Sequence, residues 1–204
     1  MELPGGRRSL YCRPFMDSDL TEMLNNKLVK DLVSWTEADQ VSAATSTIYK
    51  AKSTQSYSIH DVDKKSFLLQ EEHNQKYLLA LHLKHFNYKP EKLNVHFYIS
   101  LDNSRQPVAL ELLDRNLYLS CIKEGNQCQL KLEKPEKSLQ QISGKDLQKF
   151  LFYFKTTGTT TSFESLAHRG WYVATSKRSS ESVTVHNHLG QQFYTDFELF
   201  TEYL

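Results

Sequence analysis

Few residues in this chain have the types and spacing that chemistry requires. His82 with His85, and His186 with His188, are close enough in sequence for two imidazoles to bind one metal ion, and the second pair would share one face of a strand. A zinc site needs three or four ligands, and no third ligand lies nearby in the sequence. The motifs of phosphate-binding loops, nucleophile elbows and metalloprotease helices do not occur. We therefore expect no enzyme, no metal site and no cofactor.

The cysteines are too few and too scattered to form a disulfide scaffold. Three occur, at Cys12, Cys121 and Cys128. Cys121 and Cys128 each lie on the apolar face of an alternating run, with Gly125-Asn126 between the runs as a hairpin turn. We expect both thiols to be buried. A disulfide between them is an alternative, but small thiols on an apolar strand face usually serve as core.

Composition indicates a folded protein without an obvious nucleic-acid or membrane partner. Of the 204 residues 39% are hydrophobic and 24% are charged, and the formal net charge is only +1. Residues 1–20 contain no apolar run as long as a secretory signal, and the longest apolar stretches are far too short to cross a bilayer. We expect synthesis in the cytoplasm, a reducing compartment, without insertion into a membrane.

The first part of the chain differs in pattern from the rest. Between Asp17 and Val33 apolar residues recur at three- and four-residue spacing, which predicts a short amphipathic helix. The following stretch, Thr36–Gln55, is small and polar, as is typical of an exposed linker. We expect residues 1–50 to form a propeptide and linker, and residues 51–204 to form the folded domain.

From Tyr57 onward the pattern is that of an all-β domain. Short β-rich runs alternate with turn residues, and no long helix interrupts them. Twelve strands are predicted, at Tyr57–Asp61, Ser66–Gln70, Tyr77–Leu83, Leu93–Ser100, Pro107–Leu112, Leu117–Ile122, Gln127–Glu133, Phe150–Lys155, Ser162–Ala167, Trp171–Ser176, Ser182–Asn187 and Tyr194–Phe200. Such strands can close as a sandwich, as an up-and-down barrel, or as three units of four strands, and the pattern alone does not choose.

One stretch carries a family resemblance. Phe163–Ser176 closely resembles the signature of the interleukin-1 family, which has Phe-Glu-Ser, three variable residues, Pro-Gly-Trp, an aromatic and an aliphatic residue. The matching positions are Phe163, Glu164, Ser165, Gly170 and Trp171. Arg169 replaces the usual proline, which could loosen the turn before the tryptophan. Six further stretches agree with the family in the expected order: Ala80–Leu83, Pro107–Leu110, Asn116–Cys121, Leu130–Glu133, Phe150–Tyr153 and Thr195–Phe197.

The resemblance implies a β-trefoil, a six-stranded barrel closed at one end by three hairpins. It also implies that the signature residues are mainly core, with Phe163, Trp171 and Phe197 as packing residues. Function would then be that of a cytokine that binds an interleukin-1-type receptor with an immunoglobulin-like ectodomain and an accessory chain. We expect such a cytokine to act as a monomer and to leave the cell by a route that needs no signal peptide.

Receptor contacts are implied only where a local motif matches. His82 corresponds to a receptor-contacting histidine of the family, and we expect it to be exposed because Leu81 and Leu83 would point inward. Asp196 matches an aspartate of family agonists that the natural antagonist replaces with lysine. His60 and Lys84 are weaker candidates. A receptor antagonist and a carbohydrate- or heparin-binding trefoil are the alternatives, although the Gln-x-Trp motifs of lectin repeats are absent.

Two processing positions are also implied. Ile59-His60-Asp61 resembles an aliphatic-x-Asp triplet that many members share, and in several relatives the active N-terminus lies nine residues before it, which is Lys50 here. The second candidate is the bond between Asp39 and Gln40, because inflammatory caspases cut after Asp and accept Glu two residues earlier. We expect a caspase-like protease to cut after Asp39.

Overall fold

The structure is a computed structural model that describes residues 47–83, 89–99, 105–187 and 192–201. Within these residues the chain forms fifteen β-strands and one short 3-10 helix, η1, at Gln148–Phe150. The helix predicted at residues 17–33, the processing residues Asp39 and Gln40, and the receptor candidate Lys84 lie outside the described residues.

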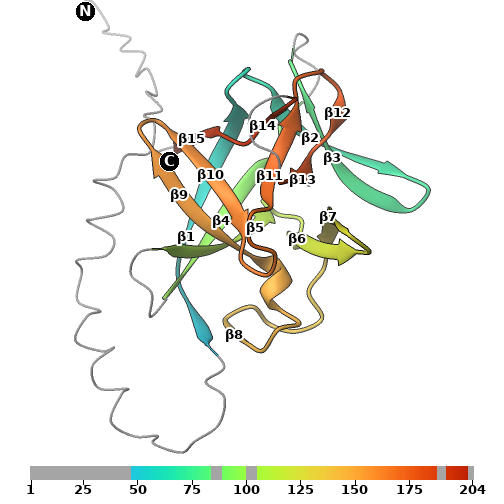
Figure 1. Ribbon diagram of the computed structural model, residues 1–204. Helices are drawn as coiled ribbons and strands as arrows, with labels where there is room; N and C mark the ends of the chain where they lie inside the picture. Colours follow the sequence, from blue (N-terminus) through green and yellow to red (C-terminus); the bar gives the residue numbers. More distant parts are fainter. Residues whose placement is uncertain (1–46, 84–88, 100–104, 188–191, 202–204) are drawn as a thin grey trace, which may run out of the picture.

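Six strands close into a barrel (Figure 1). They are β1 (Ile48–Asp61), β4 (Lys92–Ile99), β5 (Gln106–Leu112), β9 (Leu151–Thr157), β10 (Thr160–Ser165) and β15 (Phe197–Thr201). Each pairs antiparallel with the next in this order. The last strand, β15, pairs with β1, with Ile59 opposite Leu199. Because the ring closes, no barrel strand presents a free edge of unpaired backbone groups within it.

Three hairpins lie between the barrel strands. They are formed by β2 (Ser66–Glu72) with β3 (Gln75–Leu81), β6 (Leu117–Glu124) with β7 (Gln127–Glu133), and β11 (Tyr172–Ser176) with β13 (Thr184–His186). The hairpins contact one another through β3, β7 and the short strand β12 (Glu181–Ser182). Each hairpin separates two barrel strands, so the chain repeats one four-strand unit three times. This is the β-trefoil arrangement, and the sandwich and up-and-down barrel are not adopted.

Turn chemistry explains where the hairpins reverse. In the β2–β3 hairpin Glu72 lies opposite Gln75, and the two residues between them, His73 and Asn74, both have positive φ, as a type I′ turn requires. The predicted turn at Gly125-Asn126 is confirmed, with Gly125 at φ +62°. These turns set the register that sends alternate side chains of each hairpin into the core.

The main core fills the barrel and the hairpin end. Phe163 is fully buried, and its ring lies 5.7 Å from that of Phe154 and 6.0 Å from that of Phe197, measured between centroids. Of the other signature residues, Ser165 is buried and Trp171 is partly buried against this core. Glu164 is half-buried rather than core, because β10 alternates and its side chain points to the outer face.

The two cysteines of the β6–β7 hairpin are buried free thiols. Cys121 is 0% exposed and Cys128 is 7% exposed, which confirms the burial predicted from the alternating pattern. Burial is the main cause that raises the pKa of Cys121 to about 12. A thiol with so high a pKa forms little of the reactive thiolate at neutral pH.

The structure differs from the predicted strands in three ways. The run predicted at Ser182–Asn187 is two strands, β12 and β13, and the run at Tyr194–Phe200 is also two, β14 (Phe193–Tyr194) and β15. The short strand β8 (Gln141–Ser143) was not predicted, because three residues are too few for an alternating pattern to be recognised. Finally, β1 begins at Ile48 instead of Tyr57.

The long first strand corrects the linker prediction for residues 48–55. This stretch is polar, with a burial pattern in which only Tyr49 is buried, so its sequence resembles a linker. It becomes a strand because β4 pairs with it over most of its length and β8 pairs with its first residues. Pairing partners distant in sequence therefore override a weak local preference.

The aromatic contacts of the main core give a stability prediction. Phe163→Ala should lower the free energy of unfolding by about 3–5 kcal/mol, because it leaves a cavity between Phe154 and Phe197. Phe200→Ala, at a half-buried position, should cost clearly less. Urea unfolding of both variants measures the difference, and equal losses would contradict the assignment of Phe163 to the core.

Candidate functional site

The turn between β1 and β2, residues 62–65, brings together three of the four predicted receptor residues. His60 lies on β1 just before the turn and opposite Ser66 of β2. Asp61 lies opposite Phe197, so Asp196 stands beside the start of the same turn. On the other side, Ser66 pairs with Leu81, after which His82 leaves β3. We name this region the β1–β2 surface.

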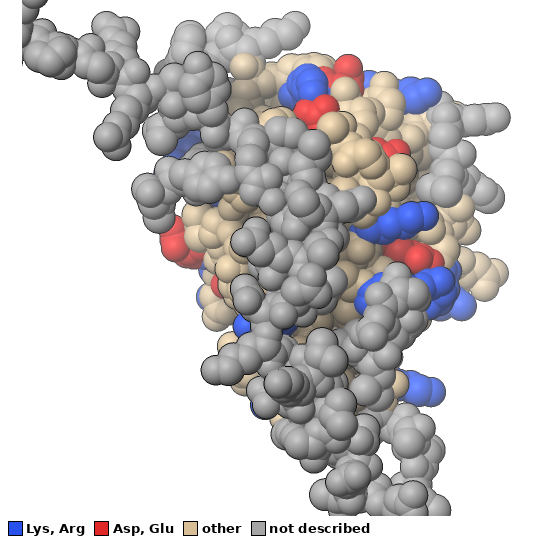
Figure 2. All heavy atoms as spheres, turned by 90° about the vertical axis from the view of Figure 1, so that its left-hand side faces the viewer, with Lys and Arg blue, Asp and Glu red and all other residues tan. Residues whose placement is uncertain are grey.

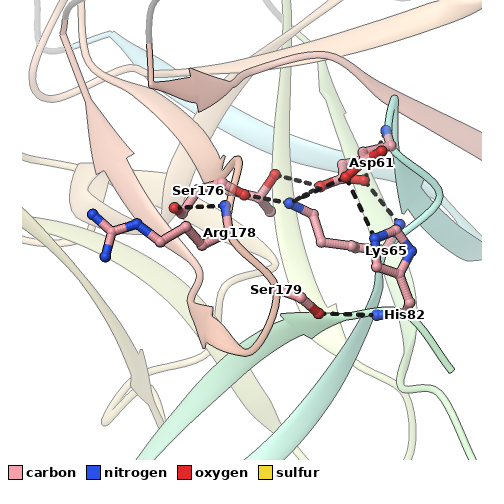
Figure 3. Close-up of polar contacts among 8 residues, drawn as sticks. Asp61, Lys65, His82, Ser176, Arg178 and Ser179 are labelled. Carbon is pink, nitrogen blue, oxygen red and sulfur yellow. Dashed lines mark hydrogen bonds and ion pairs between the residues drawn. The ribbon is translucent and has the colours of Figure 1, made fainter.

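A buried ion pair lies beneath this turn (Figure 3). Asp61 and Lys65 are both 0% exposed, and the Lys65 Nζ is 3.3 Å from the Asp61 Oδ2. The other carboxylate oxygen, Oδ1, accepts hydrogen bonds from the backbone N–H groups of Asp63 at 3.0 Å and Lys65 at 2.9 Å. The Thr175 hydroxyl donates to Oδ2 at 2.6 Å. The carboxylate of Asp61 therefore holds the turn from below and joins it to β11.

The ammonium group of Lys65 reaches further across the fold. It donates a hydrogen bond to the backbone carbonyl of Ser176, at the end of β11, and lies 5.2 Å from the centroid of the Tyr194 ring. A buried charge is costly unless it is paired and hydrogen-bonded. Both charges meet this condition, so the β1–β2 turn, the end of β11 and β14 are held in one arrangement.

His82 is connected to the buried pair through Asp63. Its Nε2 is 3.4 Å from the Asp63 Oδ2, which is itself 3.9 Å from the Lys65 Nζ. The backbone N–H of His82 also donates to the Ser179 hydroxyl at 3.5 Å (Figure 3). With 37% of its side chain exposed, His82 is accessible while its ring is oriented from one side.

The reason given for the exposure of His82 was wrong. Leu81 and Leu83 are partly exposed and do not point into the core; the buried residues of β3 are Leu78 and Ala80. β3 ends at Leu81, so the strand alternation does not continue through His82. Its accessibility comes from the chain leaving the sheet at this point.

His60 is oriented by contacts on both sides of its ring. The Nδ1 is 3.0 Å from the Ser66 hydroxyl oxygen, and the ring meets Phe200 edge-on with 5.7 Å between centroids. Burial lowers the pKa of His60 below its usual 6.5, and Lys64 adds to this, whereas Glu198 and Asp61 act in the opposite direction. Burial thus favours the neutral form of the His60 ring.

The remaining part of the β1–β2 surface is exposed. Asp196 is exposed, and its backbone is fixed because the next residue, Phe197, is fully buried. Val62, at 40% exposure, is one of two large apolar residues recorded as exposed in the described part of the chain. Lys64 forms an ion pair with Glu198 at the edge of this surface. The surface therefore combines an apolar side chain, two histidines and both signs of charge.

The charged groups of the β1–β2 surface are engaged with one another. Among the described residues no three His, Cys, Asp or Glu side chains are grouped to hold a metal ion. A pocket of about 320 Å³ lies elsewhere, lined by His96, Tyr98, Tyr118 and residues 135–140, and contains none of the predicted site residues. The charged groups of the β1–β2 turn are used to hold its shape.

Sequence reasoning did not identify the buried pair. In the sequence Asp61 belongs only to the triplet Ile59-His60-Asp61, and Lys65 belongs to no motif. The sequence carries no signal for this pair: Lys65 follows Lys64 in a polar turn, where a lysine is ordinarily exposed, and its burial depends on the distant β11 and β14.

Arg169, at the position of the family's proline, does not leave its turn unsupported. Its guanidinium Nε lies 3.6 Å from the Glu164 carboxylate and its Cζ 5.3 Å from the centroid of the Tyr153 ring. The same carboxylate accepts a hydrogen bond from the backbone N–H of Gly170 at 2.8 Å. Charge and ring contacts thus restrain the turn.

On the side of the molecule in Figure 2, basic and acidic side chains are interspersed rather than gathered by sign.

The buried pair predicts a strong dependence on both partners. Lys65→Met should lower the free energy of unfolding by about 3–5 kcal/mol, because it leaves the Asp61 carboxylate buried without its counter-charge. Adding Asp61→Asn should recover part of this loss, since the amide oxygen still accepts from the turn. Urea unfolding of the single and double variants forms the cycle, and a double variant with fully additive losses would contradict the coupling.

The lowered pKa of His60 predicts a pH dependence. The unfolded chain, with a histidine pKa near 6.5, binds a proton more readily than the folded chain, so stability should decline as pH falls below about 6.5. His60→Gln should make that decline shallower, and thermal unfolding between pH 7.5 and 5 measures it. An identical pH profile in both proteins would refute this role.

Comparison with known proteins gives a consistent result. The family model described as Interleukin-1 / 18 matches residues 67–199. Interleukin-1 beta of Bubalus carabanensis is 27% identical over 197 residues, covering 96% of this chain and 71% of that protein. Interleukin-1 beta of Sus scrofa is 33% identical over 144 residues, covering 69% and 52%. The crystal structure of chicken interleukin 1 beta is 30% identical, with a TM-score of 0.67, and covers 74% of this chain and 99% of that one.

These matches agree with the geometry. The chain has the closed barrel and three hairpins of the β-trefoil, and it aligns over nearly the whole of the chicken cytokine. Its relatives are cytokines, which are signalling proteins and not enzymes. The family model covers well over half of the sequence and includes the β2–β3 hairpin, the signature and β15 up to Leu199. The chain therefore belongs to the interleukin-1 family.

Proposed function

We propose that this chain is the precursor of a pro-inflammatory cytokine that, after N-terminal trimming, binds and activates an interleukin-1-type receptor. The observation that carries the proposal is the gathering of His60, His82 and Asp196 around one internally braced turn. The partners would be a receptor with an immunoglobulin-like ectodomain and its accessory chain, bound by a monomer of this protein.

The rigidity of the turn supports its use as a binding surface. Association costs less when the contacting groups are already ordered, because less conformational freedom is lost on binding. The buried Asp61–Lys65 pair fixes the backbone from which Val62 and Asp63 project, and Asp63 in turn orients His82. A receptor would thus meet a preformed mixture of apolar, imidazole and carboxylate groups.

Asp196 favours an agonist over an antagonist. It is an exposed carboxylate directly before a buried strand, so its position is defined while its charge is available to a partner. In this proposal His60 and His82 contribute mainly to receptor binding, and Asp196 mainly to engagement of the accessory chain. A lysine at this position would present the opposite charge to the same partner.

The precursor would be made in the cytoplasm and released by a route that does not use a signal peptide. Within the residues that the structure describes, no helix has the length and apolar character needed to span a membrane. Trimming would be carried out by a caspase-like protease, with the bond between Asp39 and Gln40 as the first candidate and a start at Lys50 as the second.

Charge reversal at Asp196 should separate binding from signalling. Asp196→Lys in the trimmed protein should bind the receptor ectodomain within about threefold of the unmodified protein, but should signal at least tenfold less in a receptor-dependent transcription assay. Equal signalling by the variant would contradict the agonist role of Asp196. Binding to heparin but to no receptor ectodomain would favour the carbohydrate-binding alternative.

Truncation of His82 should weaken receptor binding itself. His82→Ala should raise the Kd about tenfold, equivalent to about 1.4 kcal/mol, because the ring contributes a contact on a preformed surface. His73→Ala is the matched control, since His73 is 89% exposed at the tip of the β2–β3 hairpin. Surface plasmon resonance measures both, and a similar Kd for the two variants would argue against the β1–β2 surface.

A further inference from the structure

The first residues of β1 belong to the folded core. Tyr49 is 6% exposed and packs in a second core cluster, separate from the main one, which also contains Tyr98, Ile142 and Phe150. Its neighbour Ile48 is 46% exposed. One side chain of this segment is thus buried as deeply as residues of the barrel, although the surrounding sequence is polar.

The backbone of the same segment is paired on two sides. Against β8, Ile48 lies opposite Ser143 and Tyr49 opposite Ile142. Against β4, Lys50 lies opposite Ile99. On the β8 side, the Ala51 N–H donates a hydrogen bond to the Gln140 carbonyl at 2.8 Å. Lys50 therefore has ladder partners on both sides, in β4 and β8, whereas Ile48 and Tyr49 pair with β8.

Strand β8 depends on its pairing with the first residues of β1. In the described part of the chain its only strand partner is β1. The segment around it carries Leu139, which is 7% exposed, and Ile142, which is 0% exposed, into the second core cluster. The Leu139 carbonyl also accepts a hydrogen bond from the Tyr98 hydroxyl at 2.7 Å. Loss of residues 48 and 49 would remove two of the three ladder pairs of β8 and the aromatic neighbour of this segment, and would leave only Lys50 opposite Gln141.

We infer that the maturation cleavage of this chain lies N-terminal to Ile48, and that Tyr49 fixes this limit. The inference rests on the proposed function in one respect, that the chain is trimmed. It separates the two processing candidates: a product that begins at Gln40 keeps all of β1, whereas a product that begins at Lys50 lacks Tyr49. The folded unit then starts at Ile48 instead of residue 51.

Access to the bond supports the same choice. A protease binds its substrate as an extended, unpaired segment. The peptide bond between Tyr49 and Lys50 joins two residues that are already paired, Tyr49 with β8 and Lys50 with both β8 and β4. Cutting there requires β1 to leave β8 and Tyr49 to leave the core. A protease that cuts after Asp39 leaves residues 40–47 attached before the strand.

Paired substitutions in the full-length chain test the role of Tyr49. Tyr49→Ala should lower the Tm by roughly 10 °C, because a buried aromatic ring is removed from a domain of this size. Ile48→Ala, at the exposed neighbouring position, should change the Tm by less than about 2 °C. Differential scanning calorimetry measures both Tm values. Equal Tm values for the Tyr49→Ala and Ile48→Ala chains would overturn the inference.

Digestion of the same full-length chain tests the boundary. After treatment with an inflammatory caspase, and separately with chymotrypsin, which cuts after aromatic residues such as Tyr49, N-terminal sequencing of the folded product should find starts at or before Ile48. A product that starts at Lys50 and melts within 2 °C of the undigested chain would overturn the boundary. These results do not depend on receptor binding: if no form of the chain bound a receptor, the proposed function would fail while the Tyr49 result stood.

Discussion

The candidate binding surface depends on one interaction, the buried ion pair between Asp61 and Lys65. Removing two charges from water is unfavourable, and here the cost is offset because both groups are nearly fully hydrogen-bonded by the turn, by Thr175 and by the Ser176 carbonyl. Such a network has few alternative arrangements of similar energy. The exposed residues above it are therefore held in place by groups that no partner can reach.

Closure of the barrel brings residues distant in sequence to the turn above this ion pair. β1 and β15 are the first and last strands of the barrel, and their pairing places Asp196 beside a turn that lies far from it in sequence. The β2–β3 hairpin then brings His82 to the other side of that turn. In a closed barrel the interior is filled by side chains, so recognition is left to turns and outward-facing residues.

The same architecture accepts local change where other contacts compensate. In the main core the ring of Phe163 packs against those of Phe154 and Phe197. The chain replaces the signature proline with Arg169, whose contacts with Glu164 and Tyr153 restrain the turn by charge and ring packing. The turn between β10 and β11 is thus restrained without the proline.

The amino-acid sequence by itself determined the all-β class, the approximate place of twelve strands and the burial of Cys121, because alternating polarity is a local property of each strand. The stretch Phe163–Ser176 also indicated the family. Only the tertiary structure decided that residues 48–55 form a strand, that β8 exists, and that Lys65 pairs with Asp61. In each of these cases the deciding partner is set by folding: β4 and β8 for the start of β1, and the ends of β11 and β14 around the buried lysine. A local pattern cannot report the energy of a contact whose other half is distant in the chain.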